Sequence, residues 1–305
     1  MLSNGHEGAP LWPLAARRRL ILDLQLVGVL MSPAVLALLG LLIGSFLNVV
    51  IHRVPLMMER GWRIESADLL GVKIDDTPEI TLSTPRSRCP SCSHQILWYE
   101  NIPIVSYLVL RGKCSACKAP ISLRYPAIEL LTAVLFAAVG LHFGAQPTTL
   151  LWCGFAAALV ALAFIDLDTT FLPDDLTLPL MWAGIVSAAL GWIPVTLAAS
   201  VGGAVAGYLS LWTVFHAYRL IRGKEGMGAG DFKLLAALGA WMGWQAIPSI
   251  ILLSSAVGAL VGIALIVFRQ HDREVPIPFG PYLAGGGVAA LFFGEQLARL
   301  WMPSV

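Results

Sequence analysis

The chain has 305 residues, of which 57% are hydrophobic and 13% are charged, and its formal net charge is +1. Soluble domains carry about 25% charged residues, so this composition excludes an ordinary water-soluble protein and predicts an all-α polytopic membrane protein. The near-neutral charge excludes a global basic field for nucleic acid. Five cysteines are too few for a disulfide-rich secreted scaffold.

Eight apolar stretches approach the length of about 20 residues that crosses a bilayer. They lie at 33–51, 127–144, 149–167, 176–191, 196–219, 232–245, 247–268 and 281–301. The sixth stretch is short, so its separation from the seventh is the weakest boundary, and seven spans fit the hydropathy as well. We expect about eight transmembrane helices.

Glycine pairs with a spacing of four residues occur in three of these stretches. Such pairs let helices approach closely in lipid, so we expect them to serve packing rather than chemistry. The pairs are Gly40 and Gly44, Gly203 and Gly207, and Gly258 and Gly262.

Lysine and arginine orient the helices, because they gather on the cytoplasmic side of translocated spans. The segment 52–125 holds ten of the twenty. The stretch from Arg219 to Lys233 holds four more, and two follow the seventh span. This places the long polar segment in the cytoplasm and both termini outside. The triplet Arg17 to Arg19 conflicts with that orientation. Either the N-terminal tail lies at the outer interface, or translation starts at Met31, where Ser32 and Pro33 form a good helix start.

The predicted organisation therefore has four parts. Residues 1–30 form an N-terminal extension that is not needed for the first span, and residues 31–51 form the first transmembrane helix. Residues 52–126 form a cytoplasmic loop domain, and residues 127–305 form a seven-helix membrane domain.

Two C-x2-C knuckles, separated by 21 residues, lie in the cytoplasmic segment. Four thiolates in this arrangement are typical of a closed tetrahedral zinc site that stabilises a loop too small to bury a core. The predicted ligands are Cys89, Cys92, Cys114 and Cys117. A catalytic zinc keeps an open position, so we expect this one to be structural; redox or disulfide pairing is the alternative. Cys153 lies alone in a span and is expected to be a packing residue.

Aspartates gather at the predicted cytoplasmic ends of two spans, where a carboxylate is costly and is a functional candidate. Two buried carboxyl groups can share a proton and activate water against a peptide bond, which is aspartic protease chemistry. Asp231 follows Gly226-x-Gly228-x-Gly230, whose glycines would let a substrate backbone approach. Lys233 lies close in sequence and either tunes the pair or points to headgroups.

The partner of Asp231 is not fixed by periodicity. Four aspartates of the 166–175 stretch are candidates, and helix capping is the better interpretation for two of them, Asp174 and Asp175. The others are Asp166 and Asp168.

Several motifs occur in an order that resembles the type IV prepilin peptidases, the bifunctional leader peptidases and N-methyltransferases of type IV pilus and type II secretion systems. The resemblance covers most of 31–301. The motifs lie at 44–55, at the two cysteine knuckles, at 98–107, at 124–129, at 166–177, at 228–233 and at 276–282.

The resemblance implies that Asp166 and Asp231 are the catalytic pair. It also implies prepilin and pseudopilin substrates, cut after the glycine of a short basic leader at the cytoplasmic face of the bacterial inner membrane. The new N-terminal amine is then methylated from S-adenosylmethionine, and the loop with Gly112 and Lys113 is implicated in that step. The fit of Gly112 to the turn before the second knuckle is an alternative. The N-terminal extension departs from the family pattern, which bears on the start site and not on the activity.

Two other functions compete with this interpretation. The sequence Gly228-Ala229-Gly230-Asp231 also matches the GxGD signature of proteases that cut within the membrane. Alternatively, the membrane carboxylates are relay sites of a transporter with a zinc-bound regulatory loop. The cysteine loop argues against the first alternative, and the grouping of the acids at one face argues against the second.

Overall fold

The computed structural model describes residues 25–72, 79–224, 227–269, 277–299 and 301–302, and there every regular element is helical apart from two isolated bridges. The all-α prediction is confirmed. Most of the N-terminal extension, including Arg17 to Arg19, lies outside the described residues. The helices are α2 (Pro33–Leu70), α3 (Val105–Val109), α4 (Arg124–Phe143), α5 (Thr149–Thr169), α6 (Asp174–Ala189), α7 (Leu197–Arg222), α8 (Ala229–Met242), α9 (Ile247–Arg269) and α10 (Gly280–Arg299), with short 3-10 turns at Trp98–Asn101 and Trp244–Ala246.

A helix coincides with each of the eight predicted apolar stretches. Five of the described helical segments are long and apolar enough to cross a bilayer, namely α2, α4, α5, α7 and the segment Trp244–Phe268 that contains α9. Helices α6 and α8 have only 16 and 14 residues. At 1.5 Å per residue they are about 24 and 21 Å long. Length and composition thus support five membrane spans among the described residues, and they do not confirm the eight that were expected.

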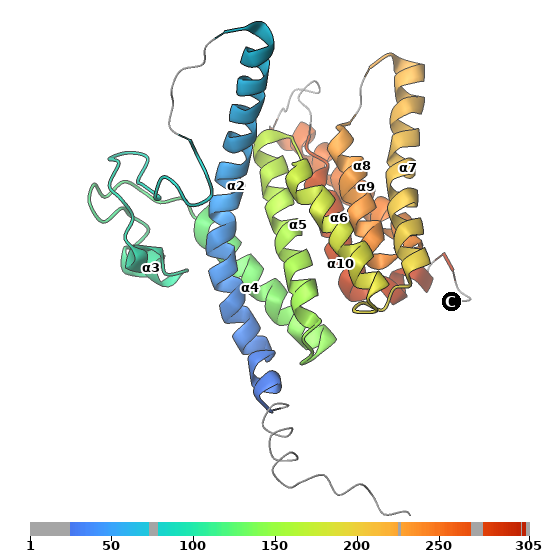
Figure 1. Ribbon diagram of the computed structural model, residues 1–305, viewed down its shortest axis with the longest axis horizontal. Helices are drawn as coiled ribbons and strands as arrows, with labels where there is room; N and C mark the ends of the chain where they lie inside the picture. The colour runs from blue at the N-terminus through green and yellow to red at the C-terminus, as the bar shows by residue number, and fades with distance from the viewer. Residues whose placement is uncertain (1–24, 73–78, 225–226, 270–276, 300, 303–305) are drawn as a thin grey trace, which may run out of the picture.

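Helix α2 is longer than predicted. The expected start is confirmed, because Ser32 caps the helix and its side chain accepts a hydrogen bond from the amide of Val35. The helix does not end with the expected span at residue 51 but continues through Pro55 to Leu70, and it stops where Gly71 adopts a left-handed conformation. Hydropathy marks where the chain leaves the lipid, not where the helix ends. In Figure 1, α2 projects beyond the neighbouring helices.

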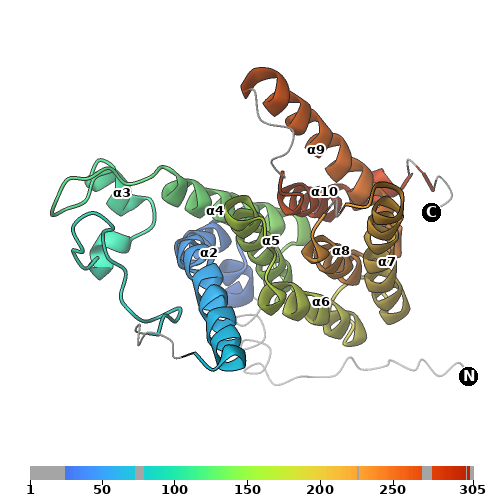
Figure 2. The same ribbon diagram turned by 90° about the horizontal axis from the view of Figure 1, so that it is seen from above.

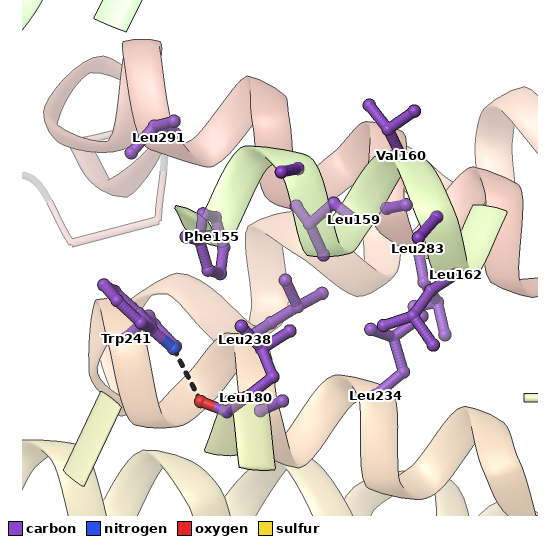
Figure 3. Packing of buried hydrophobic residues seen from close by; sticks show 14 of the residues in the cluster. Phe155, Leu159, Val160, Leu162, Leu180, Leu234, Leu238, Trp241, Leu283 and Leu291 are labelled. Carbon is purple, nitrogen blue, oxygen red and sulfur yellow. Dashed lines mark hydrogen bonds between the residues drawn. The ribbon is translucent and has the colours of Figure 1, made fainter. Parts of the chain in front are cut away.

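The core of the bundle surrounds α5. Phe155, Leu159 and Leu162 of α5 pack between α8 and α10 and are 1% exposed or less (Figure 3). On the other side of α8, the indole N–H of Trp241 donates to the carbonyl oxygen of Leu180 at 2.8 Å. Close packing and such interhelical hydrogen bonds hold helices together in lipid.

Glycine packing is confirmed between helix backbones. A Cβ atom on Gly203 of α7 would lie 2.2 Å from the carbonyl oxygen of Gly239 in α8, and one on Gly40 of α2 would lie 2.7 Å from the Cα of Ala133 in α4. The third predicted pair, in α9, faces side chains instead. Seen from above, one end of α9 stands away from the bundle (Figure 2). Only 17% of the apolar part of the segment Trp244–Phe268 is buried, against 61% for α5.

Candidate active site and metal centre

A cavity of about 560 Å³ lies where the end of α5 meets the starts of α6, α8 and α10. Its lining includes both Asp166, from the last turn of α5, and Asp231, from the first turn of α8. The structure therefore brings together the two aspartates that the sequence motifs pair.

Both side chains are buried. Asp166 is 4% exposed and Asp231 is 7% exposed, and no other aspartate among the described residues is buried. The two carboxyl groups also repel each other electrostatically. Two like charges in a poorly solvated cavity cannot both ionise easily, so the pair can hold one proton between them.

The amide of Gly280 completes the surroundings of Asp166. It donates to Oδ2 of Asp166 at 2.8 Å, although the two residues are 114 positions apart in the chain. The 276–282 motif is recognisable in the sequence, but the sequence assigns no role to this glycine. The only local pattern at this position is a glycine followed by a proline, which predicts the start of a helix and not a contact with Asp166.

The competing aspartates have other partners. Asp168 accepts two hydrogen bonds from the guanidinium group of Arg124, at 2.6 and 2.7 Å, and that group also lies over the ring of Phe164. A bidentate ion pair of this kind fixes the side chain on the side of α4. Asp168 is therefore not available as a partner of Asp231.

Asp174 and Asp175 do not cap α6. The N-cap residue is Pro173, and both acids lie in the first helical turn. Asp174 accepts from Nζ of Lys233 with both carboxylate oxygens at 2.7 Å, and Asp175 is exposed. The ammonium group of Lys233 therefore pairs with the carboxylate of Asp174, and both residues line the cavity.

The glycines before Asp231 have different surroundings. A Cβ on Gly230 would lie 2.7 Å from Cβ of Leu172, so this glycine is needed for packing and does not open a path to a substrate backbone. Gly228 has nothing closer than 4.0 Å in that direction and fits the expected approach. Gly226 lies outside the described residues.

The four predicted cysteines lie together outside the bundle, with all their Sγ atoms within 4.8 Å of one another. The Sγ atoms of Cys89 and Cys117 are 3.8 Å apart, and those of Cys92 and Cys114 are 4.0 Å apart. None is disulfide-bonded. The cluster thus has the composition and size of a four-thiolate metal site.

Backbone amides favour the thiolate form at two of these four cysteines. The N–H groups of Ser91 and Cys92 lower the pKa of Cys89 to about 6. Those of Cys117 and Ala116 likewise lower the pKa of Cys114. Amides that favour thiolates favour metal binding, because the thiolate is the ligand.

The nearby His94 and the remaining cysteine, Cys153, are not part of the cluster. The ring of His94 lies within hydrogen-bonding distance of Glu100 and Ser115. Cys153 is 2% exposed within the bundle, as expected of a packing residue. The described donor set therefore consists of cysteines alone.

Gly112 is needed by the turn before the second knuckle. Its φ is +66°, and a Cβ there would lie 2.7 Å from the hydroxyl oxygen of Tyr107. The amide of Ile121 also donates to the Gly112 carbonyl oxygen. Lys113, which follows, is exposed. This geometry favours the turn interpretation of Gly112.

The loop domain is fixed to the membrane helices by buried charged groups. The Arg53 guanidinium of α2 donates to the carbonyl oxygens of Thr81 and Pro85, at 2.8 and 2.5 Å. The Glu129 carboxylate of α4 accepts from the amide of Ile104 at 2.7 Å. Both residues belong to recognisable sequence motifs, but their anchoring role follows only from the fold.

Most of the chain is similar in sequence to known proteins. Residues 38–143 match the bacterial peptidase A24 N-terminal domain, and residues 153–263 match the type IV leader peptidase family. A prepilin leader peptidase/N-methyltransferase of Aeromonas hydrophila is 53% identical over 272 residues, which are 88% of this chain and 92% of that protein. The chain belongs to the type IV leader peptidase family.

Other members of the family are similar over the same extent. Proteins with the same name from Pseudomonas aeruginosa and Burkholderia pseudomallei are 51% and 47% identical, over 87% and 94% of this chain and 91% and 92% of their own lengths. No solved structure is significantly similar. The cysteine cluster lies in the segment that matches the A24 N-terminal domain, and both buried aspartates lie in the segment that matches the leader peptidase family. Gly280 lies beyond both matched segments.

Proposed function

We propose that this membrane enzyme cleaves the short basic leader of type IV prepilins and pseudopilins after its glycine, at the cytoplasmic face, and methylates the new N-terminal amine. The observation that carries the proposal is the pair of buried aspartates, Asp166 and Asp231, in one cavity. The names of the relatives, prepilin leader peptidase/N-methyltransferase, supply the substrate class and the second activity.

Asp166 and Asp231 are the catalytic residues in this proposal. A pair that holds one proton can remove a proton from a water molecule while it donates a hydrogen bond to the scissile carbonyl. The same pair can then protonate the departing amine. The cavity that they line has about 560 Å³, enough for an extended peptide segment of a few residues.

We place eight helices in the bilayer of the bacterial inner membrane, with the cavity at the cytoplasmic face. Helices α6, α8 and α10 are shorter or less apolar than the five clear spans, but they share the buried core with α5, which supports a common membrane bundle. The proposed units are the extension 1–30, the span 31–51, the cytoplasmic domain 52–126 and the membrane domain 127–305. Nucleic acid has no role in this proposal.

Zinc is the proposed ligand of Cys89, Cys92, Cys114 and Cys117. A tetrahedral Zn–S distance of about 2.3 Å requires sulfur atoms about 3.8 Å apart, and the measured separations of 3.8 and 4.0 Å fit this requirement. Four cysteines leave no open position, so the ion would hold the two knuckles together and take no part in the reaction.

S-adenosylmethionine would supply the methyl group, which the free amine of the cleaved product accepts. Gly112 and Lys113 are the residues that we assign to this step. The contact between Gly112 and Tyr107 supports an indirect contribution, in which the glycine shapes the turn. The exposed side chain of Lys113 is free to approach a substrate.

The test uses the purified full-length chain in detergent and a synthetic prepilin with a basic leader, followed by glycine and phenylalanine. Products are identified by mass spectrometry with and without S-adenosylmethionine. We expect cleavage before the phenylalanine, addition of one methyl group with the cofactor, and no cleavage by the Asp231→Ala protein. A folded chain that leaves several such substrates intact contradicts the proposal.

A further inference from the structure

The carboxylate of Asp166 is held by a group from a distant helix. Gly280 is the first residue of α10, and its N–H donates to Oδ2 of Asp166 at 2.8 Å. Amides in the first turn of a helix have no partner within the helix, and the helix dipole makes this end positive. Both effects favour a negative charge on Asp166.

Asp231 also lies in the first turn of a helix, α8, but in the described part of the chain it has no partner from a second helix. The amide that interacts with it belongs to Gly228, at the N-cap of its own helix, and among the described residues no hydrogen bond from another helix reaches its carboxyl group. The negative charge of Asp166 acts on it instead. The other ionisable groups that line the cavity, Asp174 and Lys233, neutralise each other. The amide of Gly280 is therefore what distinguishes the two aspartates.

A side chain at position 280 would collide with the carboxylate of Asp166. A Cβ there would lie 2.6 Å from Oδ2 and 3.1 Å from Cγ of Asp166. The residue is not among the glycines with positive φ, so its backbone conformation is open to other residues. Any side chain would push the carboxylate away from the amide that holds it.

We propose that Gly280 is a positioning residue of the peptidase centre, whose amide keeps the negative charge of the aspartate pair on Asp166 and leaves the proton on Asp231. This inference rests on the proposed peptidase function. It assigns Asp166 as the base and Asp231 as the acid.

The assignment gives a balanced reaction. Asp166 takes a proton from water as the water oxygen attacks the scissile carbonyl carbon, and Asp231 gives its proton to the carbonyl oxygen. Asp166 then passes its proton to the nitrogen as the C–N bond breaks. The ionised Asp231 recovers a proton from one hydroxyl group of the tetrahedral intermediate. One peptide bond and one water molecule become a carboxylic acid and an amine, and both aspartates return to their starting states.

Two reagents distinguish the carboxyl groups in the unmodified protein. An ionised carboxylate opens an epoxide to form an ester, and water protonates the resulting alkoxide. A protonated carboxyl group reacts with a diazoacetyl ester: the proton goes to the diazo carbon, the carboxylate displaces N₂, and an ester forms. Peptide mapping by mass spectrometry then locates each ester.

We expect the epoxide on Asp166 and the diazo-derived ester on Asp231. The reverse pattern, both labels on one residue, or no preference overturns the charge assignment. Labelling needs no turnover, so this result is independent of whether the chain cleaves prepilins.

A matched pair of glycine variants tests the positioning role. Gly280→Ala brings a methyl group against Asp166, whereas Gly285→Ala, on the same helix, adds one where nothing lies within 4 Å. Displacement of a catalytic group by about 1 Å can cost about 100-fold in rate. We expect Gly280→Ala to lower kcat for prepilin cleavage by at least about tenfold, with KM within about twofold, and to reduce epoxide labelling of Asp166.

Gly285→Ala should match the wild-type protein in all three measurements. If Gly280→Ala also matches it, Gly280 has no positioning role. Loss of cleavage by Asp231→Ala in the same assay separates that result from a failure of the proposed peptidase function.

Discussion

The region from α2 to α4 and the bundle from α5 to α10 both bury ionisable side chains, but with opposite surroundings. In the first region, the charges of Arg53 and Glu129 are satisfied by backbone carbonyl and amide groups of the loop domain. In the second, Asp166 and Asp231 line a cavity and repel each other. A buried charge that is hydrogen-bonded to the backbone of another segment holds the fold together, whereas a buried charge beside a like charge is poised for proton transfer.

The two regions also differ in how they are stabilised. The bundle is held by apolar helix packing and by glycine contacts, such as the one between Gly203 and Gly239. After α2, the described part of the loop domain, residues 79–123, has only short helical segments and two isolated bridges. A segment without a sizeable apolar core needs other constraints, and here these are the cysteine cluster and the buried anchors.

Removal of one charge of the proposed catalytic pair should give the largest effect and should separate activity from stability. We expect Asp166→Asn to lower cleavage by about 10²- to 10⁴-fold, because a group that transfers protons is lost. The melting temperature should stay the same or rise, because one of two repelling buried groups is neutralised. Cleavage of a synthetic prepilin and thermal unfolding in detergent measure both. Asp175→Asn, an exposed acid of the next helix, is the control, and near-normal cleavage by Asp166→Asn contradicts the dyad.

Loss of one thiolate of the cysteine cluster should affect the loop domain and leave the bundle from α5 to α10 unchanged. We expect about one zinc ion per wild-type chain and much less in Cys92→Ser, because a closed tetrahedral site requires all four ligands. Elemental analysis reports the zinc, and limited proteolysis should show faster cutting between residues 79 and 123. Cys153→Ser is the matched control in the bundle. Equal zinc content in the wild-type and Cys92→Ser proteins excludes the metal site.

Much of the difference between the two regions can be predicted from the sequence. What cannot be predicted depends on contacts between residues that are far apart in the chain. Apolar stretches locate the helices, and the C-x2-C spacing identifies the thiolate cluster. Local patterns cannot choose among neighbouring aspartates, since the partners that exclude Asp168 and Asp174 lie 44 and 59 positions away. The resemblance to a family supplies the choice of Asp166. The Gly280 contact depends on how α10 packs against α5, which no local pattern encodes.

The buried anchor in α2 should have a moderate, local effect. Arg53 makes two hydrogen bonds with its planar guanidinium group, and lysine cannot reproduce this fork. Hydrogen bonds to charged groups contribute about 1.5–3 kcal/mol, so Arg53→Lys should loosen residues 79–103 by about that amount. Hydrogen exchange measured by mass spectrometry tests this. Arg63→Lys, in an exposed pair with Glu59 on the same helix, is the control. If the exchange of residues 79–103 is the same in Arg53→Lys and wild-type protein, Arg53 is not an anchor.

The ion pair between Lys233 and Asp174 should have the smallest effect. The two side chains are 29% and 47% exposed, so water can solvate either group when the other is removed. Partly exposed pairs contribute up to about 1 kcal/mol, so we expect Lys233→Met and Asp174→Asn each to change cleavage by less than about fivefold. The double variant should resemble the single ones, because both remove the same interaction. If Lys233→Met instead lost as much activity as Asp166→Asn while Asp174→Asn did not, Lys233 would act on the aspartate pair directly. Lys233, which lines the cavity, would then take part in the reaction.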